Sequence, residues 1–170
     1  MIQIANGYIP DKSIKEVVKL LARDIDRKIA ERERNPIMLG CLNGSFIFMA
    51  DLVREMQSDC EVKFCTISSY KGNEKQSKIG IQIPFIEKDA DIIIIEDIID
   101  SGDSIKHLLK KLENWNPKSV EICTLLKRHT CRDININYVG FELIDDSFVY
   151  GYGMDNSGKG RGRRSVNKIK

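Results

Sequence analysis

Two kinds of hydrophobic pattern alternate along the chain. Apolar residues recur every three or four positions over residues 14–30, 45–56 and 105–112, which is the period of an amphipathic helix, and Asp11 or Ser13 is available to cap the first of these. Short, mostly apolar runs, typical of buried strands, cover residues 37–42, 62–67, 92–95, 120–126, 138–143 and 148–154. Because strands alternate with helices, the sequence predicts an α/β fold: a mostly parallel twisted sheet flanked by helices on both faces.

Two segments lack either pattern. Residues 68–82 are polar and contain Gly and Lys, and a loop of this length in a compact domain is usually functional or mobile, so we expect a mobile lid loop. Residues 157–170 are rich in Gly and Arg, and we expect this basic tail to become ordered only with a ligand. The chain has no internal repeat and no low-complexity tract, so residues 1–170 are interpreted as a single domain.

Composition narrows the class of protein. The 170 residues are 42% hydrophobic and 31% charged, as in a soluble globular protein, and the net charge of +2 argues against nucleic-acid binding by the whole surface. The five cysteines are odd in number, and Cys41, Cys65 and Cys123 lie in apolar runs, so we interpret them as core thiols in a reducing cytoplasm. Neither a signal peptide nor an apolar stretch of about 20 residues is present, so we expect a cytoplasmic protein with no membrane contact.

The segment 92–105 carries the strongest chemical signal. Four isoleucines are followed by Glu96, Asp97 and Asp100, then by the polar turn 101–104 and the start of a helix. Backbone N–H groups at such a strand–turn–helix junction suit a phosphate, and carboxylates beside a phosphate require a cation or sugar hydroxyls between them. The combination suggests a phosphorylated ribose with a divalent metal. A buried strand capped by a polar turn is the simpler alternative, and acids also end strands in receiver domains and nucleotide hydrolases; no P-loop motif occurs.

This segment resembles the phosphoribosyl pyrophosphate (PRPP) signature of type I phosphoribosyltransferases. The form Glu-Asp-Ile-Ile-Asp is most similar to hypoxanthine-guanine phosphoribosyltransferases, whose fold adds a small hood to the sheet. The resemblance implies that Glu96 and Asp97 hold the ribose hydroxyls, directly or through waters of the metal. It also implies that Asp100 is the catalytic residue, accepting a proton from the N7 side of a purine. The ligands of the 5′-phosphate would be Ser101, Gly102, Asp103 and Ser104, with the Asp103 side chain pointing outward.

Two further segments resemble parts of the family that handle the pyrophosphate. The run Leu42-Asn43-Gly44-Ser45 resembles a pyrophosphate loop usually written Leu-Lys-Gly-Ser, in which the first peptide bond is cis; here Asn43 replaces the lysine. A plain strand-to-helix turn is the alternative. By count, Arg161 matches an arginine that reaches pyrophosphate, whereas we interpret Arg163 and Arg164 as part of a solvated tail. The pair Ser69-Tyr70 resembles the family's lid, with a solvated hairpin as the alternative.

Two other segments resemble the purine pocket of the family. One of Lys127 and Arg128, after the apolar run 120–126, would donate to the O6 atom of a 6-oxopurine; a surface basic pair is the alternative. The run 148–155 resembles an element in which Phe148 stacks on the purine, the backbone of Val149 reads the base edge, and Asp155 holds a second magnesium ion. An aromatic core strand is the alternative for this segment.

The sequence therefore predicts a purine-salvage phosphoribosyltransferase that converts hypoxanthine or guanine and PRPP to the nucleotide and pyrophosphate. Its expected cofactor is Mg²⁺, with Glu96, Asp97 and Asp155 as ligands, and its partners are PRPP, 6-oxopurine bases and further copies of the chain in a homodimer or homotetramer. Two alternatives are a regulatory protein of the same fold that senses PRPP or nucleotides and binds RNA, and a phosphoribosyltransferase that prefers xanthine. The near-zero net charge counts against the RNA-binding alternative.

Overall fold

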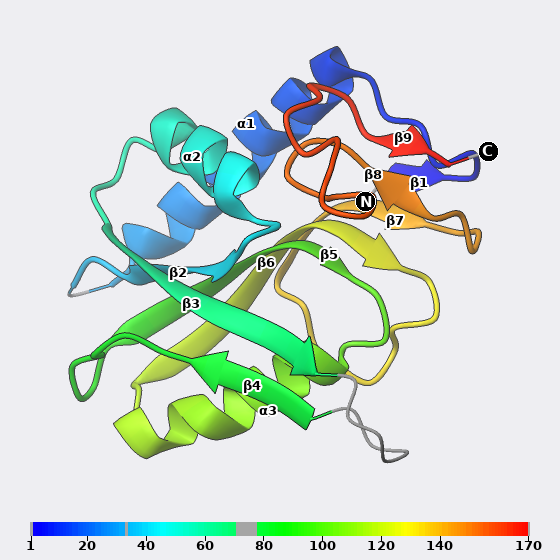
Figure 1. Cartoon of the computed structure of the whole chain (residues 1–170). Coiled ribbons are helices and arrows are strands. Elements are labelled where there is room, and N and C mark those ends of the chain that lie inside the picture. Colours follow the sequence, from blue (N-terminus) through cyan, green and yellow to red (C-terminus); the bar gives the residue numbers. More distant parts are fainter. Residues whose placement is uncertain (1, 33, 71–77, 170) are drawn as a thin grey trace.

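The protein is built on one large sheet (Figure 1). The computed structural model describes residues 2–32, 34–70 and 78–169. Within that part of the chain the sheet has the strand order β1-β7-β6-β5-β2-β3-β4, parallel throughout except for β4. Its strands are β1 (Ile2–Ile4), β2 (Ile37–Leu42), β3 (Glu61–Tyr70), β4 (Lys78–Gln82), β5 (Asp91–Ile99), β6 (Ser119–Arg128) and β7 (Tyr138–Leu143). The predicted α/β class and mostly parallel sheet are confirmed.

Helices cover both faces of the sheet (Figure 1). The helices are α1 (Asp11–Ile29), α2 (Phe46–Glu55) and α3 (Asp103–Leu112), followed by the 3-10 turn η1 (Glu113–Trp115). Alternate isoleucines of β5 face opposite layers: Ile93 and Ile95 pack in the cluster under α1 and α2, whereas Ile92 and Ile94 pack with α3. All four are 0% exposed, which explains why this strand needs apolar residues at consecutive positions.

Several predicted boundaries are wrong. Strand β5 continues through the acids to Ile99 instead of ending at the isoleucines. The expected loop 68–82 is largely an antiparallel hairpin, because β3 extends to Tyr70 and β4 occupies 78–82; residues 71–77, the rest of the predicted lid, lie outside the described residues. Neither Asp11 nor Ser13 caps α1, whose N-cap is Pro10.

The carboxyl-terminal tail, which we expected to become ordered only with a ligand, is packed into the fold. The predicted strand 148–154 shrinks to β8 (Val149–Tyr150), which pairs with β9 (Asn167–Lys168) in a second, two-stranded sheet. Val166 is 0% exposed and forms a bridge with Ile9, so the tail is held by main-chain hydrogen bonds and by the core. This small unit lies beyond the carboxyl ends of β6 and β7 (Figure 1).

Two further expectations concern the cysteines and membrane-spanning helices. The predicted core thiols Cys41, Cys65 and Cys123 are buried, and none of the five cysteines is in a disulfide. Among the described residues, no helix is long and apolar enough to cross a membrane.

Candidate active site

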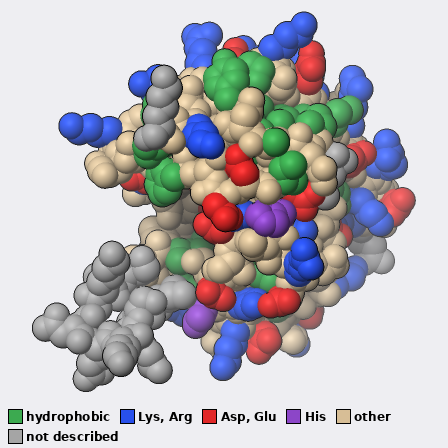
Figure 2. Space-filling model, turned by 90° about the vertical axis from the view of Figure 1, so that its right-hand side faces the viewer, with side chains coloured by type: hydrophobic (Ala, Val, Ile, Leu, Met, Phe, Trp, Pro, Cys, Tyr) green, Lys and Arg blue, Asp and Glu red, His purple; other side chains and the backbone are tan. Residues whose placement is uncertain are grey.

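The acids and the polar turn meet the end of β2 at the carboxyl edge of the sheet. A cavity of about 250 Å³ is lined there by Leu42 and Gly44, by Glu96 and by residues 98–105. Figure 2 shows the end of the molecule to which these strands point; acidic, basic and hydrophobic side chains are interspersed, and no single sign of charge covers this face. The topology therefore brings together two sequence segments that are distant along the chain, as expected for ligand sites of parallel sheets.

The turn 101–104 has the backbone that a phosphate site needs. Gly102 is the N-cap of α3 with φ +85°, a left-handed conformation that favours glycine, and a Cβ atom there would collide with Ile134. The Ser101 hydroxyl donates to Asp103 Oδ2 at 3.0 Å, and the Asp103 N–H donates to Ser101 Oγ at 3.3 Å. Asp103 is exposed, in line with the expected outward side chain, and the positive end of α3 faces the turn.

Glu96 and Asp97 form a closely spaced pair of acids. The Glu96 carboxylate accepts a hydrogen bond from the Asp97 N–H at 3.2 Å. Burial, followed by the neighbouring Asp97 carboxylate, holds the pKa of Glu96 well above its usual range. Asp97 is 7% exposed and lies against Gly44, where a Cβ atom would overlap its carboxylate.

This pair fits a hard divalent cation. Its donors are carboxylate oxygens, and within the described ranges no lysine or arginine forms an ion pair with either. The third predicted ligand, Asp155, is not brought to them: no group of three His, Cys, Asp or Glu side chains suited to a metal occurs among the described residues. Asp155 instead forms an ion pair of 2.6 Å with Arg161, which also donates to the Gly153 carbonyl at 2.7 Å.

The predicted pyrophosphate loop has an unusual backbone. The peptide bond between Leu42 and Asn43 is cis, as the resemblance implied. Gly44 is enclosed on a second side, because a Cβ atom on Gly153 would overlap its carbonyl oxygen. The Ser45 hydroxyl and N–H both donate to the Cys41 carbonyl, at 2.8 and 3.2 Å, which ties the loop to the start of α2.

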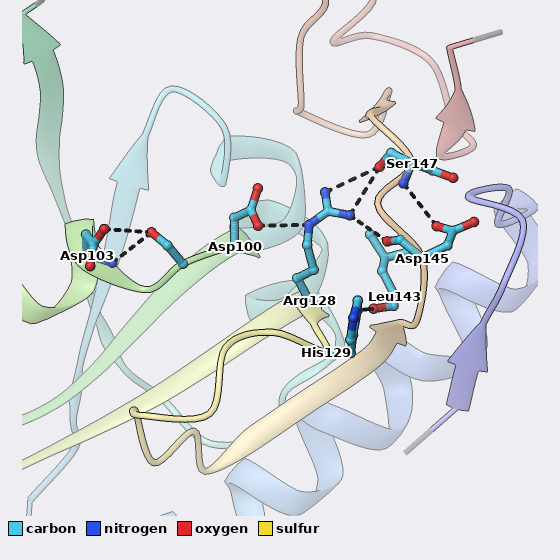
Figure 3. A network of polar contacts seen from close by, with 8 residues as sticks. Asp100, Asp103, Arg128, His129, Leu143, Asp145 and Ser147 are labelled. Carbon is cyan, nitrogen blue, oxygen red and sulfur yellow. Dashed lines mark hydrogen bonds and ion pairs between the residues drawn. The ribbon is translucent and has the colours of Figure 1, made fainter.

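Arg128 is the centre of a network that joins three segments (Figure 3). Its guanidinium donates to the main-chain carbonyls of Asp145, at 2.8 Å, and Ser147, at 3.3 Å, and its Nε atom lies 2.8 Å from Asp100 Oδ1. The Arg128 side chain is 9% exposed, whereas that of Asp100 is 65% exposed. Lys127 alternates to the other face of β6, where its charge acts on Cys131.

The remaining predicted residues lie on β3 and on or beside β8. Phe148 follows Ser147 directly and is 58% exposed, whereas Val149 is buried in β8. Ser69 and Tyr70 end β3, where their backbones pair with β4. The carbonyls of Asp145 and Ser147 were missed by sequence reasoning, because main-chain acceptors leave no residue signature. The pairing of Arg161 with Asp155 was also missed.

Comparisons with known proteins agree with this geometry. The family described as the phosphoribosyl transferase domain matches residues 10–157. The chain is 36% identical over 166 residues to a hypoxanthine phosphoribosyltransferase of Escherichia coli, covering 95% of the chain and 93% of the relative. It is 35% identical over 157 residues to a hypoxanthine-guanine phosphoribosyltransferase of Bacillus subtilis, covering 89% and 86%.

The solved structures that this chain resembles belong to the same family. A crystal structure of a hypoxanthine-guanine phosphoribosyltransferase from Bacillus anthracis superposes with a TM-score of 0.84 at 32% identity, covering 99% of this chain and all of the other. A hypoxanthine phosphoribosyltransferase from Staphylococcus aureus superposes with a TM-score of 0.84 at 30% identity, covering 94% and 88%. The predicted family is thereby confirmed, and the chain belongs to the phosphoribosyltransferases that are related to the hypoxanthine and hypoxanthine-guanine enzymes.

Proposed function

We propose that the protein transfers the 5-phosphoribosyl group of PRPP to hypoxanthine or guanine, in purine salvage. The observation that carries this proposal is the cavity at the carboxyl edge of the sheet. It is lined by the phosphate-type turn 101–104, by Glu96 and Asp100, and by the loop with the cis peptide at Leu42. A sugar that carries both a phosphate and a pyrophosphate requires a phosphate-binding turn, acids for its hydroxyls and a pyrophosphate loop in the same cavity.

The turn and the acids hold the ribose phosphate. Backbone N–H groups of residues 101–104 and the positive end of α3 receive the 5′-phosphate. Glu96 and Asp97 accept hydrogen bonds from the two ribose hydroxyls, and a cation beside Glu96 would offset the burial that raises its pKa. The loop Leu42, Asn43 and Gly44 lies opposite and supplies backbone donors to the pyrophosphate.

Asp100 is the residue placed to move the proton. N9 of the purine attacks C1 of the ribose, the bond to pyrophosphate breaks, and positive charge develops on the sugar. Asp100 accepts the proton from the N7 side of the base, and its carboxylate stabilises the charge. Its anchor is Arg128, whose Nε atom is 2.8 Å away and whose other nitrogens are fixed on carbonyls.

Arg128 also has the chemistry to select the base. Three of its four Nη hydrogens are used by the carbonyls of Asp145 and Ser147, which leaves one Nη2 hydrogen for the O6 atom of a 6-oxopurine. The amino group of adenine would face that donor with no acceptor. Phe148 offers an exposed ring for stacking, and the Val149 backbone follows at the base edge. Lys127 lies on the other face of β6, so we assign base selection to Arg128.

We further propose that Mg²⁺ is bound by Glu96 and Asp97, with a second ion at Asp155. When bound, the metal neutralises charge on the pyrophosphate that leaves. Arg161 would then exchange Asp155 for the pyrophosphate. Ser69 and Tyr70 would belong to a lid that excludes water from the reactive sugar. Copies of the chain would assemble as a homodimer or homotetramer in the cytoplasm.

The test is nucleotide formation from PRPP and Mg²⁺ with hypoxanthine, guanine, xanthine and adenine in parallel. Release of pyrophosphate with hypoxanthine or guanine, and very little with adenine, is the expected result. Binding of PRPP without turnover of any base would contradict the proposal and favour a sensor of the same fold. Turnover of xanthine in preference to the other bases would correct the substrate.

A further inference from the structure

Cys41 and Cys65 face each other across two neighbouring strands. They are register partners in the parallel pair β2–β3, and their Sγ atoms are 3.7 Å apart. Neighbouring strands lie about 4.8 Å apart, inside the range of Cα separations at which a disulfide closes without backbone rearrangement. Cys123, a third buried thiol, lies on β6 and has no sulfur partner among the described residues.

The pair is buried yet reachable from the site. Cys41 is 2% and Cys65 is 1% exposed to bulk solvent, but Cys41 lines the cavity beside Leu42, Gly44 and Glu96. A small uncharged oxidant that enters the cavity therefore reaches the wall that Cys41 helps to form, where the Cys65 sulfur is in contact with that of Cys41.

The two sulfur atoms are in contact, and no disulfide joins them. This contact lowers the pKa of Cys65, so its sulfur is the attacking group. Two thiols in contact are the arrangement in which one is oxidised and the other resolves it.

We propose that Cys41 and Cys65 are a site of reversible oxidative modification, which form a disulfide in the presence of a peroxide and thereby close the pyrophosphate loop to substrate. The Cys65 thiol loses its proton as its sulfur attacks one peroxide oxygen, the O–O bond breaks, and the leaving hydroxide takes up that proton, so that a sulfenic acid and water are formed. The thiol of Cys41 attacks that sulfur and loses its proton, the S–O bond breaks, and a second water leaves. Two thiols are oxidised to one disulfide and one peroxide is reduced to two waters. A dithiol reductant reverses the change.

The position of Cys41 connects the modification to the site. Its carbonyl accepts both hydrogen bonds from Ser45, and its chain continues into Leu42, Asn43 and Gly44. To bond, the two sulfur atoms must approach by about 1.7 Å. A shift of about 1 Å in groups that position a substrate can lower turnover by about a hundredfold. The effect on activity rests on the proposed function, whereas the thiol chemistry does not.

The experiment uses the full chain, freed of reductant and treated with hydrogen peroxide. Peptide mapping by mass spectrometry without reduction should find residues 41 and 65 joined, and PRPP binding by calorimetry and turnover should both fall at least about tenfold. Dithiothreitol should restore them. Saturation with PRPP before oxidation should slow the joining, because the ligand fills the cavity. Cys65→Ala should keep its activity in peroxide, while Cys123→Ala, the matched buried thiol, should be inactivated like the unmodified protein.

The possible outcomes test disulfide formation, its effect on the pyrophosphate loop and the proposed function separately. Absence of the joined peptide in the oxidised, unmodified protein overturns the proposal, even if Cys65→Ala does not fold. A joined peptide with unchanged PRPP binding overturns the link to the loop. Failure of the reduced protein to bind PRPP would count against the proposed function instead, and the peptide map would still decide the thiol chemistry.

Discussion

Arg128 Nε lies 2.8 Å from Asp100 Oδ1, so a buried guanidinium on β6 orients an exposed carboxylate at the end of β5. The same guanidinium fixes the carbonyls of Asp145 and Ser147, which immediately precede Phe148. The group expected to move the proton and the segment expected to contact the base are therefore joined through one side chain (Figure 3). A change at Arg128 should affect both proton transfer and base binding, whereas a change at Asp100 should affect the first alone.

Replacement of Asp100 by Asn should lower kcat by about two to four decades, the usual contribution of a general base. The amide keeps the size of the side chain but cannot accept the proton. Steady-state kinetics with hypoxanthine and saturating PRPP would measure the effect, with calorimetric PRPP binding as the control for an intact site. Turnover within a factor of a few of the unmodified protein would exclude Asp100 as the base.

Base choice should depend on Arg128. The unmodified protein should use 6-oxopurines and reject adenine by at least about a thousandfold in kcat/KM, because a buried donor would be left unpaired. Arg128→Met should reduce this ratio by at least about tenfold. Arg128→Lys keeps a donor but cannot hold two carbonyls, so it should preserve the oxo preference while raising KM for the base.

Lys127→Met is the matched control for Arg128. Its side chain lies on the other face of β6, so kcat/KM for each base should stay within about twofold of the unmodified value. If Lys127→Met relaxes the discrimination and Arg128→Met does not, the base is read by the other residue of the pair.

The sequence predicted the buried strands of the sheet better than its edge strands and the carboxyl-terminal tail. Buried strands such as β2 and β7 are apolar runs, interrupted in β7 only by Glu142, and their bounds agree with the structure to the residue. The three-residue β1 and the strand β4 pair at the edges, where exposure weakens the apolar signal. The tail was misjudged because Val166, its buried anchor, is one of only two apolar residues in a segment rich in Gly, Lys and Arg.

In the candidate site too, some features could be predicted from the sequence and others could not. The run from Glu96 to Ser104 could be identified because its residues are contiguous and chemically unusual. Contacts such as that between Arg161 and Asp155 depend on loop geometry, which residue types do not encode. The choice between Lys127 and Arg128 required the direction of each side chain from β6, which follows from strand register once the strand's faces are known.

Activity should depend on Mg²⁺ or Mn²⁺. The buried pair Glu96 and Asp97 offers hard oxygen ligands, and the pyrophosphate of the substrate supplies more. Protein treated with EDTA and then desalted should be inactive until either metal is added back, whereas Na⁺ at the same ionic strength should not restore activity. Full turnover in the metal-free protein would contradict the metal site.

Asp145 should stabilise the folded protein at neutral pH, and this contribution to the free energy of unfolding should be lost in acid. Its pKa is lowered by the hydrogen bond from Ser147 and by the charges of Lys168 and Arg128. Because the folded pKa lies below the unfolded value of about 3.9, its contribution is complete above that pH and is lost as pH falls through the folded pKa. Asp145→Asn should lower the free energy of unfolding by about 1 kcal/mol at pH 7, and the difference should vanish in strong acid.

Urea unfolding of both proteins from pH 7 down to strong acid, about pH 1, would measure this difference. Asp146→Asn is the control, because Asp146 is exposed and makes no hydrogen bond or ion pair among the described residues, so its variant should follow the unmodified protein at every pH. A pH-independent gap between Asp145→Asn and the unmodified protein would show that the charge is not responsible.

Gly44 should tolerate no side chain. A Cβ atom at this position would overlap the Asp97 carboxylate, which is itself 7% exposed and cannot swing into solvent without opening the loop. Gly44→Ala should therefore weaken PRPP binding by at least about tenfold and lower the free energy of unfolding by about 1–3 kcal/mol, the usual cost of overpacking. Gly162→Ala is the matched control, since a Cβ atom on Gly162 meets nothing within 4 Å. Calorimetric PRPP binding and urea unfolding should separate the two variants clearly. Equal affinity for PRPP in both would mean that Asp97 and the loop can move apart, and that the close contact at Gly44 does not shape the pyrophosphate site.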